Sequence, residues 1–141
     1  MIHTRTEYAI TGYDELLQGV FLRFLRKGTS EEFREANQRL LQTMREYSTQ
    51  RVNLDVLHLG LVSPEDQRWM ANLIIPRLAE LAPNNYLYIA VVVPESTFTR
   101  LAMKSIEDMS NGKGICDYCQ FPNLVEAKQW LFLQPSGVLV K

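Results

Sequence analysis

The stretch that most constrains the fold is Tyr86–Val93, which reads YLYIAVVV and is apolar at nearly every position. A strand that is apolar on both faces has to be covered on both faces, as in a parallel sheet whose crossover helices pack against it. The run is also far too short to cross a bilayer as a helix, which needs about 20 residues. The sequence therefore predicts an α/β fold with an internal strand at this position.

A strand, a turn and an amphipathic helix follow one another within Val52–Leu81. Ser63 is a favourable N-cap for this helix, and Pro64 falls at its first position, where a missing N–H costs nothing. Pro76 removes a hydrogen bond from the helix interior, which predicts a kink or a restart near Leu73 to Ile75. A βα turn is where α/β domains usually place their functional residues.

The remaining apolar patterns complete an alternation of strands and helices. Tyr8–Tyr13 and Val20–Arg26 flank a turn that contains Asp14 and Gly19, which predicts an antiparallel hairpin. Strands are also expected at 52–56, 86–93 and 115–121, with helices after 29, 63, 96 and 122. The order ββαβαβαβα predicts a mixed, mostly parallel five-stranded sheet with about four helices. The apolar tail Phe132–Lys141 has no clear period and predicts no element.

The helix that follows the apolar strand has its own apolar periodicity. Phe98, Leu101, Ala102, Ile106 and Met109 recur at helical spacing. Such a stripe is typical of a helix that packs on a sheet. We therefore expect these five side chains to face the core.

Composition limits the class of protein. The 141 residues suit one domain that spans the whole chain and buries roughly two-thirds of its unfolded surface. With 15 basic and 16 acidic residues and no basic block, no net field favours a nucleic acid or an anionic membrane. No apolar run is long enough for a membrane span, and the N-terminal MIHTRTEY does not resemble a secretory signal. A cytoplasmic location is the default expectation.

The only two cysteines, Cys116 and Cys119, form a Cys-x-x-Cys motif. This spacing occurs in redox pairs and in half of a zinc site, but a zinc site needs about four ligands and only His3 and His58 could add nitrogen. The surrounding sequence ICDYCQF is typical of a strand, in which positions three apart point to opposite faces. We therefore expect structural cysteines, with neither a metal nor another cofactor.

Six polar residues near strand ends are the candidate site residues. Asp55 could be a functional carboxylate, but the favoured interpretation is a strand-end acid that bonds nearby backbone N–H groups. His58 and Ser63 could form a base and a nucleophile, but no Gly-x-Ser-x-Gly elbow accompanies them. Asp66 stands three residues after Ser63, where it could complete a capping box. The set of candidates consists of Asp55, His58, Ser63, Glu65, Asp66 and Glu95.

Several local features occur together along the chain. They are Gly-Thr-Ser-Glu-Glu-Phe at 28–33, Leu54-Asp55 in a strand, Val-Ser-Pro-Glu-Asp-Gln at 62–67 followed by Trp69, Pro76-Arg77, Val-Pro-Glu at 93–95, and Ala127-x-x-Trp130-Leu131. With a hairpin followed by three strand–helix units, this pattern resembles the STAS or SpoIIAA-like class, in particular small SpoIIAA-like proteins of Bacteroidetes-type bacteria. The class borders on the CRAL-TRIO lipid-transfer architecture. The resemblance covers roughly Tyr8 to Leu131.

The resemblance implies a regulatory or protein-interaction domain rather than an enzyme. Anti-anti-sigma members carry a phosphorylatable serine in an Asp-Ser-Ser-Gly-type motif at the start of the helix after the third strand. Ser63 stands near that place, but the turn reads LVSPED and lacks the Ser-Ser-Gly run. A phosphate on Ser63 would meet like charge at Glu65 and Asp66.

Two functional hypotheses follow. In the first, the chain is a non-enzymatic domain that docks a protein partner through the Ser63 helix and the loop around Glu95, and a homodimer is one form of such a partner. In the second, a small apolar or lipid-like ligand binds between the Pro76-containing helix and the sheet.

Overall fold

The apolar run becomes strand β5 (Leu87–Val92) in a computed structural model that describes residues 1–139. β5 pairs in parallel with β4 (Arg51–Asp55) on one side and with β6 (Cys116–Phe121) on the other. Leu87, Ile89 and Val91 lie in the main core cluster, whereas Ala90 and Val92 lie in a second cluster on the opposite face. The prediction of an internal parallel strand is confirmed.

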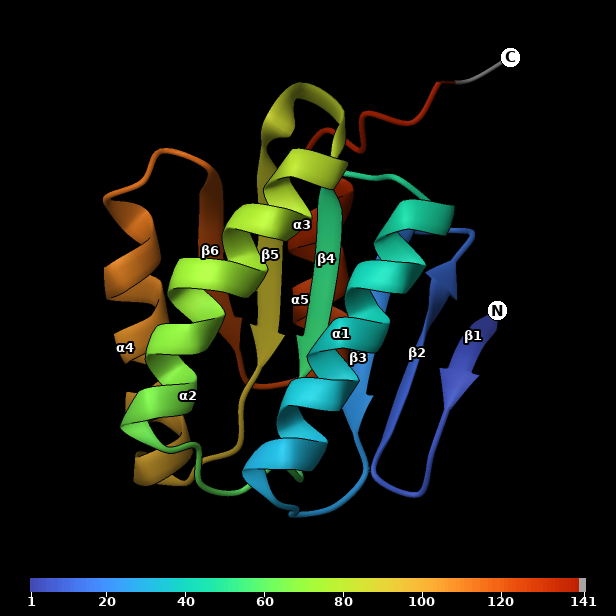
Figure 1. Cartoon of the computed structure of the whole chain (residues 1–141). Helices are drawn as coiled ribbons and strands as arrows, with labels where there is room; N and C mark the ends of the chain where they lie inside the picture. The colour runs from blue at the N-terminus through green and yellow to red at the C-terminus, as the bar shows by residue number, and fades with distance from the viewer. Residues whose placement is uncertain (140–141) are drawn as a thin grey trace.

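The sheet has six strands, and their order in space is their order in the chain (Figure 1). The first three are β1 (Ile2–Arg5), β2 (Ala9–Asp14) and β3 (Gly19–Phe24). The pairs β1–β2 and β2–β3 are antiparallel, and the pairs from β3 to β6 are parallel. The α/β class is confirmed, but the expected five-stranded, mostly parallel sheet is corrected to a mixed sheet of six strands.

The additional strand is β1, which no apolar pattern in the sequence predicts. Ile2 and His3 are exposed, so the strand buries little, and pairing with β2 holds it in place. The hydroxyl groups of Thr4 and Thr11 lie 2.6 Å apart, and the N–H of Tyr13 donates to the carbonyl oxygen of Met1 at 2.8 Å. Cross-strand contacts rather than burial specify this element.

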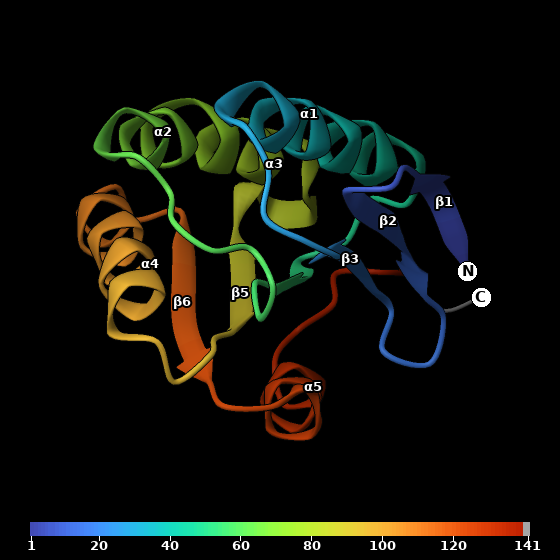
Figure 2. The same ribbon diagram turned by 90° about the horizontal axis from the view of Figure 1, so that it is seen from below.

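Helices cover both faces of the sheet. Their bounds are α1 (Ser30–Glu46), α2 (Pro64–Trp69), a π turn η1 (Met70–Ile74), α3 (Ile75–Leu81), a 3₁₀ turn η2 (Pro83–Asn85), α4 (Thr97–Asn111) and α5 (Leu124–Phe132). Figure 2 shows α1, α2 and α3 along one side of the sheet and α5 on the other. Right-handed crossovers that all advance in one direction place their helices on one face.

The helix that begins after Ser63 runs without interruption through α2, η1 and α3. The N–H of Ile75 donates to the carbonyl of Met70, five residues earlier, which makes this turn wider than an α turn. Pro76 supplies the reason, since it has no N–H and its ring clashes with the carbonyl of Asn72 in a regular helix. The predicted interruption thus takes the form of a π turn.

Helix α4 buries Ala102 and Ile106 in the main core cluster, with Met109 packed against it, as its apolar spacing predicts, but the first two residues of the stripe behave differently. Phe98 and Leu101 are 71% and 60% exposed, whereas Thr99 and Met103 are buried. The prediction that Phe98 and Leu101 pack on the sheet is therefore wrong. Thr99 is accepted inside because its hydroxyl donates to the carbonyl of Gly60 at 3.1 Å, so the buried polar group is paired.

The segment after α5 returns to the sheet. The N–H of Gln50, just before β4, donates to the carbonyl of Ser136 at 2.7 Å, and the Thr49 hydroxyl donates to the same carbonyl at 3.2 Å. The last two residues of the apolar tail lie outside the described range. No helix within residues 1–139 combines the length and apolar character that a membrane crossing requires.

Candidate functional site

The carboxyl ends of β3, β4, β5 and β6 meet at one edge of the sheet, and α1, α2, α4 and α5 start from it (Figure 1, lower edge). In open α/β sheets, ligands bind outside the carboxyl ends of the strands. This edge is therefore the first place to look for a functional surface.

A hollow of about 740 Å³ lies at this edge. It runs between the β3–α1 loop, the β4–α2 loop and the start of α4, and we call it the edge groove. Its walls include Lys27, Leu57, His58, Leu61 and Phe98. The apolar members are exposed, Leu57 to 37%, Leu61 to 77% and Phe98 to 71%.

Smaller hollows continue the edge groove on both sides. Leu61 also lines a hollow of about 440 Å³ at the starts of α1 and α2, which includes Ser63 and Asp66. Leu57 also lines a hollow of about 480 Å³ that includes Glu95. The structure thus distributes His58, Ser63, Asp66 and Glu95 along one continuous edge, as four of the six candidates. Glu65 is exposed in the first turn of α2, beside Ser63.

Asp55 lies away from the edge groove. Its Oδ1 accepts a hydrogen bond from the N–H of Leu57 at 3.2 Å, and its Oδ2 lies 3.5 Å from Nε of Arg23. Val52 and Leu54 face the main core, so alternation along β4 turns Asp55 toward the face that carries α5. The predicted role of a strand-end acid that bonds the backbone is confirmed.

Ser63 caps α2, as predicted, because its Oγ accepts from the N–H of Asp66 at 3.1 Å. The Asp66 carboxylate does not complete the expected capping box. Its Oδ1 accepts from Nε of Arg34 at 2.8 Å and from the hydroxyl of Ser30 at 3.0 Å, both on α1. A hydrogen bond between a carboxylate and a guanidinium joins two opposite charges and is stronger than one to a neutral backbone N–H. The Asp66 carboxylate therefore bonds to α1 and not to the start of its own helix.

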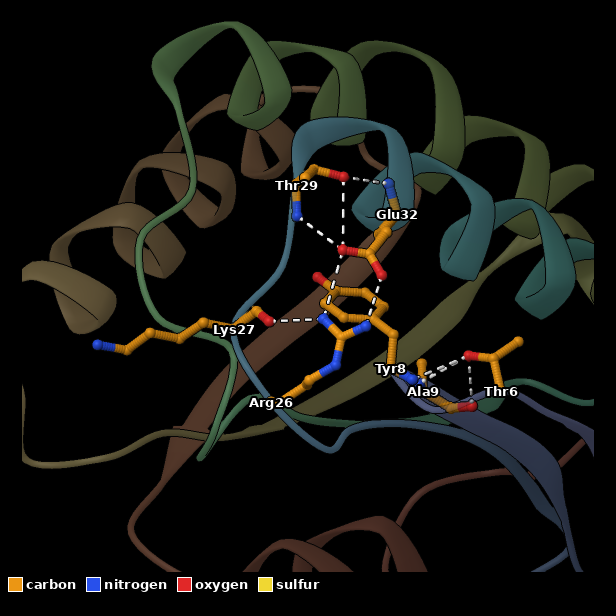
Figure 3. A network of polar contacts seen from close by, with 7 residues as sticks. All are labelled: Thr6, Tyr8, Ala9, Arg26, Lys27, Thr29 and Glu32. Atoms are coloured by element: carbon orange, nitrogen blue, oxygen red, sulfur yellow. Dashed lines mark hydrogen bonds and ion pairs between the residues drawn. The ribbon is translucent and has the colours of Figure 1, made fainter.

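The β3–α1 loop at the groove wall is fixed by the polar network in Figure 3. Thr29 and Glu32 form a capping box, in which each side chain accepts from the other's backbone N–H. Nη2 of Arg26 lies 2.7 Å from Oε2 of Glu32, and its guanidinium carbon lies 5.4 Å from the centre of the Tyr8 ring. Thr29 and Glu32 were recognisable from their spacing, whereas the role of Arg26 depends on the fold.

Members of this network have shifted pKa values, and the network also holds the backbone of Lys27. The hydrogen bond from Arg26 lowers the pKa of Glu32, and burial raises the pKa of Tyr8 to about 12. The carbonyl of Lys27 accepts from Nη1 of Arg26 at 2.8 Å, while its side chain extends away from the network (Figure 3). The ammonium forms no ion pair with any residue of the described range.

Arg100, at the start of α4, lines the hollow next to Glu95 and likewise forms no ion pair with a residue that the structure describes. His58 makes no side-chain hydrogen bond within residues 1–139, and it lines a different hollow from Ser63. In the same range, no group of three or more His, Cys, Asp or Glu residues is placed to hold a metal ion.

The two cysteines have separate surroundings. Cys116 is buried in the main core cluster, and alternation along β6 turns Cys119 toward the opposite face of the sheet. Both are free thiols. Burial raises the pKa of Cys116 to about 11 and also raises that of Cys119. A raised thiol pKa is the opposite of what a reactive thiolate needs.

The space between the Pro76-containing helix and the sheet is occupied by side chains. Ile74, Ile75 and Leu78 are 0%, 0% and 1% exposed and belong to the main core cluster. The hollows described above lie at the sheet edge. An apolar ligand is therefore better accommodated in the edge groove than beneath this helix.

No family model, curated protein or solved structure matches the chain in any of the three comparisons. The basis for a function is thus the edge groove itself, with its exposed apolar walls and the Lys27 ammonium, together with Arg100 in the adjoining hollow.

Proposed function

We propose that this chain is a non-enzymatic protein-interaction domain of the STAS-like regulatory kind, and that it binds an apolar, acidic segment of a partner protein in the edge groove. The observation that carries the proposal is the exposure of Leu61 and Phe98 on two walls of one groove. Contiguous exposed apolar surface rimmed by polar groups is typical of interaction sites. Burial of each such side chain contributes about 1.5–3 kcal/mol.

Charge supports a partner with carboxylates. Lys27 lines the groove and Arg100 lines the adjoining hollow that shares Leu57 with it, and each lacks an ion pair among the described residues. Complementary charges at the rim of an interface steer association and fix register. A segment that places an apolar anchor between two acidic residues would satisfy both features of the surface.

The regulatory part of the proposal rests on the position of Ser63 and on the element order. Ser63 is exposed at the start of α2 in the hollow that shares Leu61 with the edge groove. A charge added at Ser63 would alter the potential beside the binding surface. The hairpin followed by three strand–helix units also supports a STAS-like domain.

The experiment is selection of short random peptides displayed on phage against the purified protein. We expect enriched peptides that combine a large apolar residue with Asp or Glu. Leu61→Ser and Phe98→Ser should each weaken binding about tenfold in titration calorimetry, which corresponds to about 1.4 kcal/mol. Leu133→Ser is the matched control, because Leu133 is 82% exposed at the end of α5, on the opposite face.

Equal binding to all three variants, or enrichment of basic peptides only, would overturn the proposal. Native mass spectrometry of the purified protein distinguishes the second hypothesis from it. A lipid-like adduct that is retained by the protein and lost in Phe98→Ser would assign the groove to an apolar ligand. A dimer that dissociates in the same variant would make a second copy the partner.

A further inference from the structure

Aromatic side chains form a row on the sheet face that carries α5 (Figure 2). Tyr86 stands directly before β5, Tyr88 lies within β5, Trp130 lies on α5 and Phe121 ends β6. The ring centres lie 5.3 Å apart for Tyr86 and Tyr88, 6.5 Å for Tyr88 and Trp130, and 5.7 Å for Trp130 and Phe121. All four residues are only partly buried, and we call them the aromatic row.

Packing of α5 on the sheet accounts for three of these rings. Tyr88, Phe121 and Trp130 contact the second core cluster. Tyr86 belongs to neither core cluster, and its hydroxyl donates to Oδ1 of Asp117 at 2.8 Å. Burial, together with this hydrogen bond, raises the pKa of Tyr86 to about 12. The phenol is therefore a neutral donor that holds the Asp117 carboxylate.

Asp117 lies beside two rings of the row. It pairs with Tyr88 in the parallel register of β5 and β6, and alternation turns it to this face because Cys116 faces the main core. Asp117 is exposed and forms no ion pair with any residue in the range 1–139. It is thus an accessible anion with Tyr86 and Tyr88 as its neighbours.

A second unpaired carboxylate stands on the same side of α5. Glu126 precedes Trp130 by four residues, about one helical turn, and forms no ion pair among the described residues. Lys128, the one basic residue of α5, is engaged elsewhere, since its Nζ lies 3.0 Å from Oδ2 of Asp14. Unpaired carboxylates of this kind attract a positively charged ligand.

The rings decide which cation fits. Tyr88 meets Tyr86 at an angle of 60° and Trp130 at 68°, so the three rings form a corner and not a flat platform. Aromatic faces attract cations through the ring quadrupole, and alkylated ammonium groups are recognised in this way. A metal ion is a poorer match, because no three metal-binding side chains converge within the described residues.

We propose that Tyr86, Tyr88, Asp117 and Trp130 form a binding site for a methylated ammonium group, carried by a free choline-like molecule or by a methylated lysine side chain. The charge lies against the Asp117 carboxylate, the methyl groups contact Tyr88 and Trp130, and Tyr86 orients the carboxylate. The site lies near the amino ends of β5 and β6, away from the edge groove, and requires nothing of it.

The test titrates the labelled protein with choline and with a short neutral peptide that contains trimethyl-lysine. Binding is followed in ¹H–¹⁵N spectra, where the indole N–H of Trp130 and the backbone N–H of Asp117 report directly. We expect both cations to shift these signals in a saturable manner, and the tighter binder identifies the source of the group.

Matched probes separate the charge from the methyl groups. 3,3-Dimethylbutan-1-ol has the shape of choline without its charge, and the same peptide with unmodified lysine has the charge without the methyl groups. Each should bind about tenfold more weakly than its methylated, charged counterpart.

Asp117→Asn keeps an acceptor for the Tyr86 hydroxyl but removes the charge, and it should weaken choline binding about tenfold. Because Asp117 is exposed, the fold should be retained. Tyr88→Leu removes a ring and should have a similar effect. Asp108→Asn is the matched control, since Asp108 is an exposed acid on α4 that lies 3.1 Å from Nζ of Lys104, and it should bind choline like the unmodified protein.

The inference is overturned if 3,3-dimethylbutan-1-ol binds as well as choline, if the unmodified lysine peptide equals the trimethylated one, if Asp117→Asn binds choline normally, or if neither cation shifts these signals. Leu61→Ser, which alters the edge groove, should bind choline normally. That result separates the fate of this site from that of the proposed protein-binding surface.

Discussion

Arg34 on α1 and Asp66 on α2 join two helices by an ion pair in which Nε lies 2.8 Å from Oδ1. The Asp66 side chain is 4% exposed and that of Arg34 37%. The guanidinium carbon of Arg34 also lies 5.0 Å from the centre of the Trp69 ring, so the cation has an aromatic contact as well as an anionic one. The pair sets the spacing of the two helix starts that border one hollow of the edge.

Asp66→Ala is expected to lower the free energy of unfolding by about 2 kcal/mol, measured by urea denaturation. Removal of one partner from a buried pair costs about 3–5 kcal/mol, and the partial exposure of Arg34 reduces that cost. Glu65→Ala is the control, because Glu65 is 80% exposed and lies 3.7 Å from the same guanidinium. An equal loss in both variants would show that the buried geometry is unimportant.

Ser63→Ala should lower the stability by about 1 kcal/mol, because the N–H of Asp66 loses its acceptor at the start of α2. Ser63→Asp keeps an acceptor and adds a negative charge at the positive end of the helix dipole. It should therefore retain most of the stability in the same denaturation experiment. A Ser63→Asp protein as unstable as Ser63→Ala would contradict the capping role.

The sequence predicts those parts of the fold that depend on a single element. YLYIAVVV specifies an internal strand by itself, and Ser63 identifies a helix start because capping is local. β1 was missed, since Thr4 and its neighbours are held by pairing with β2 and not by burial. Likewise, Thr99 can face the core because its hydroxyl donates to the carbonyl of Gly60, and only the fold brings these two residues together.

The candidate site was predictable to a similar extent. His58 and Glu95 follow strands, and Ser63 stands at a helix start. These positions predict that all three lie at one edge, because the carboxyl ends of parallel strands meet there. The burial of Asn53 could not be predicted. Asn53 looks like an ordinary polar residue in an alternating strand, and it is covered by segments that lie far away in the sequence.

Cys116 and Cys119 should not form a disulfide with each other under mild oxidation. A disulfide needs its two Cβ atoms about 3.5–4.5 Å apart, and these side chains lie on opposite faces of the sheet. Intact mass spectrometry after treatment with oxidised glutathione is the measurement. Cys119, which is partly exposed, should be modified before buried Cys116, and an internal disulfide would contradict the assignment of the two faces.

Stability should fall as the pH rises from about 9 to about 11. Burial raises the pKa of the Cys116 thiol from 9.0 to about 11, so the unfolded chain releases this proton first. The contribution is fully present below the unfolded pKa and is lost as the pH passes through the folded value. Cys116→Ala should make the pH dependence of the unfolding free energy shallower across this interval, whereas an unchanged slope would exclude Cys116 as its source.

The strand order β1 to β6 has a consequence for how the chain is made. Each strand pairs with the strand synthesised just before it, so a growing chain never has to wait for a later segment to complete an earlier ladder. Such sequential pairing is compatible with growth of the domain from the N-terminus during synthesis. The exceptions are α5 and Ser136, which reach back to β4 and its preceding residues. Closure of the α5 face therefore has to wait until α5 and Ser136 have been synthesised.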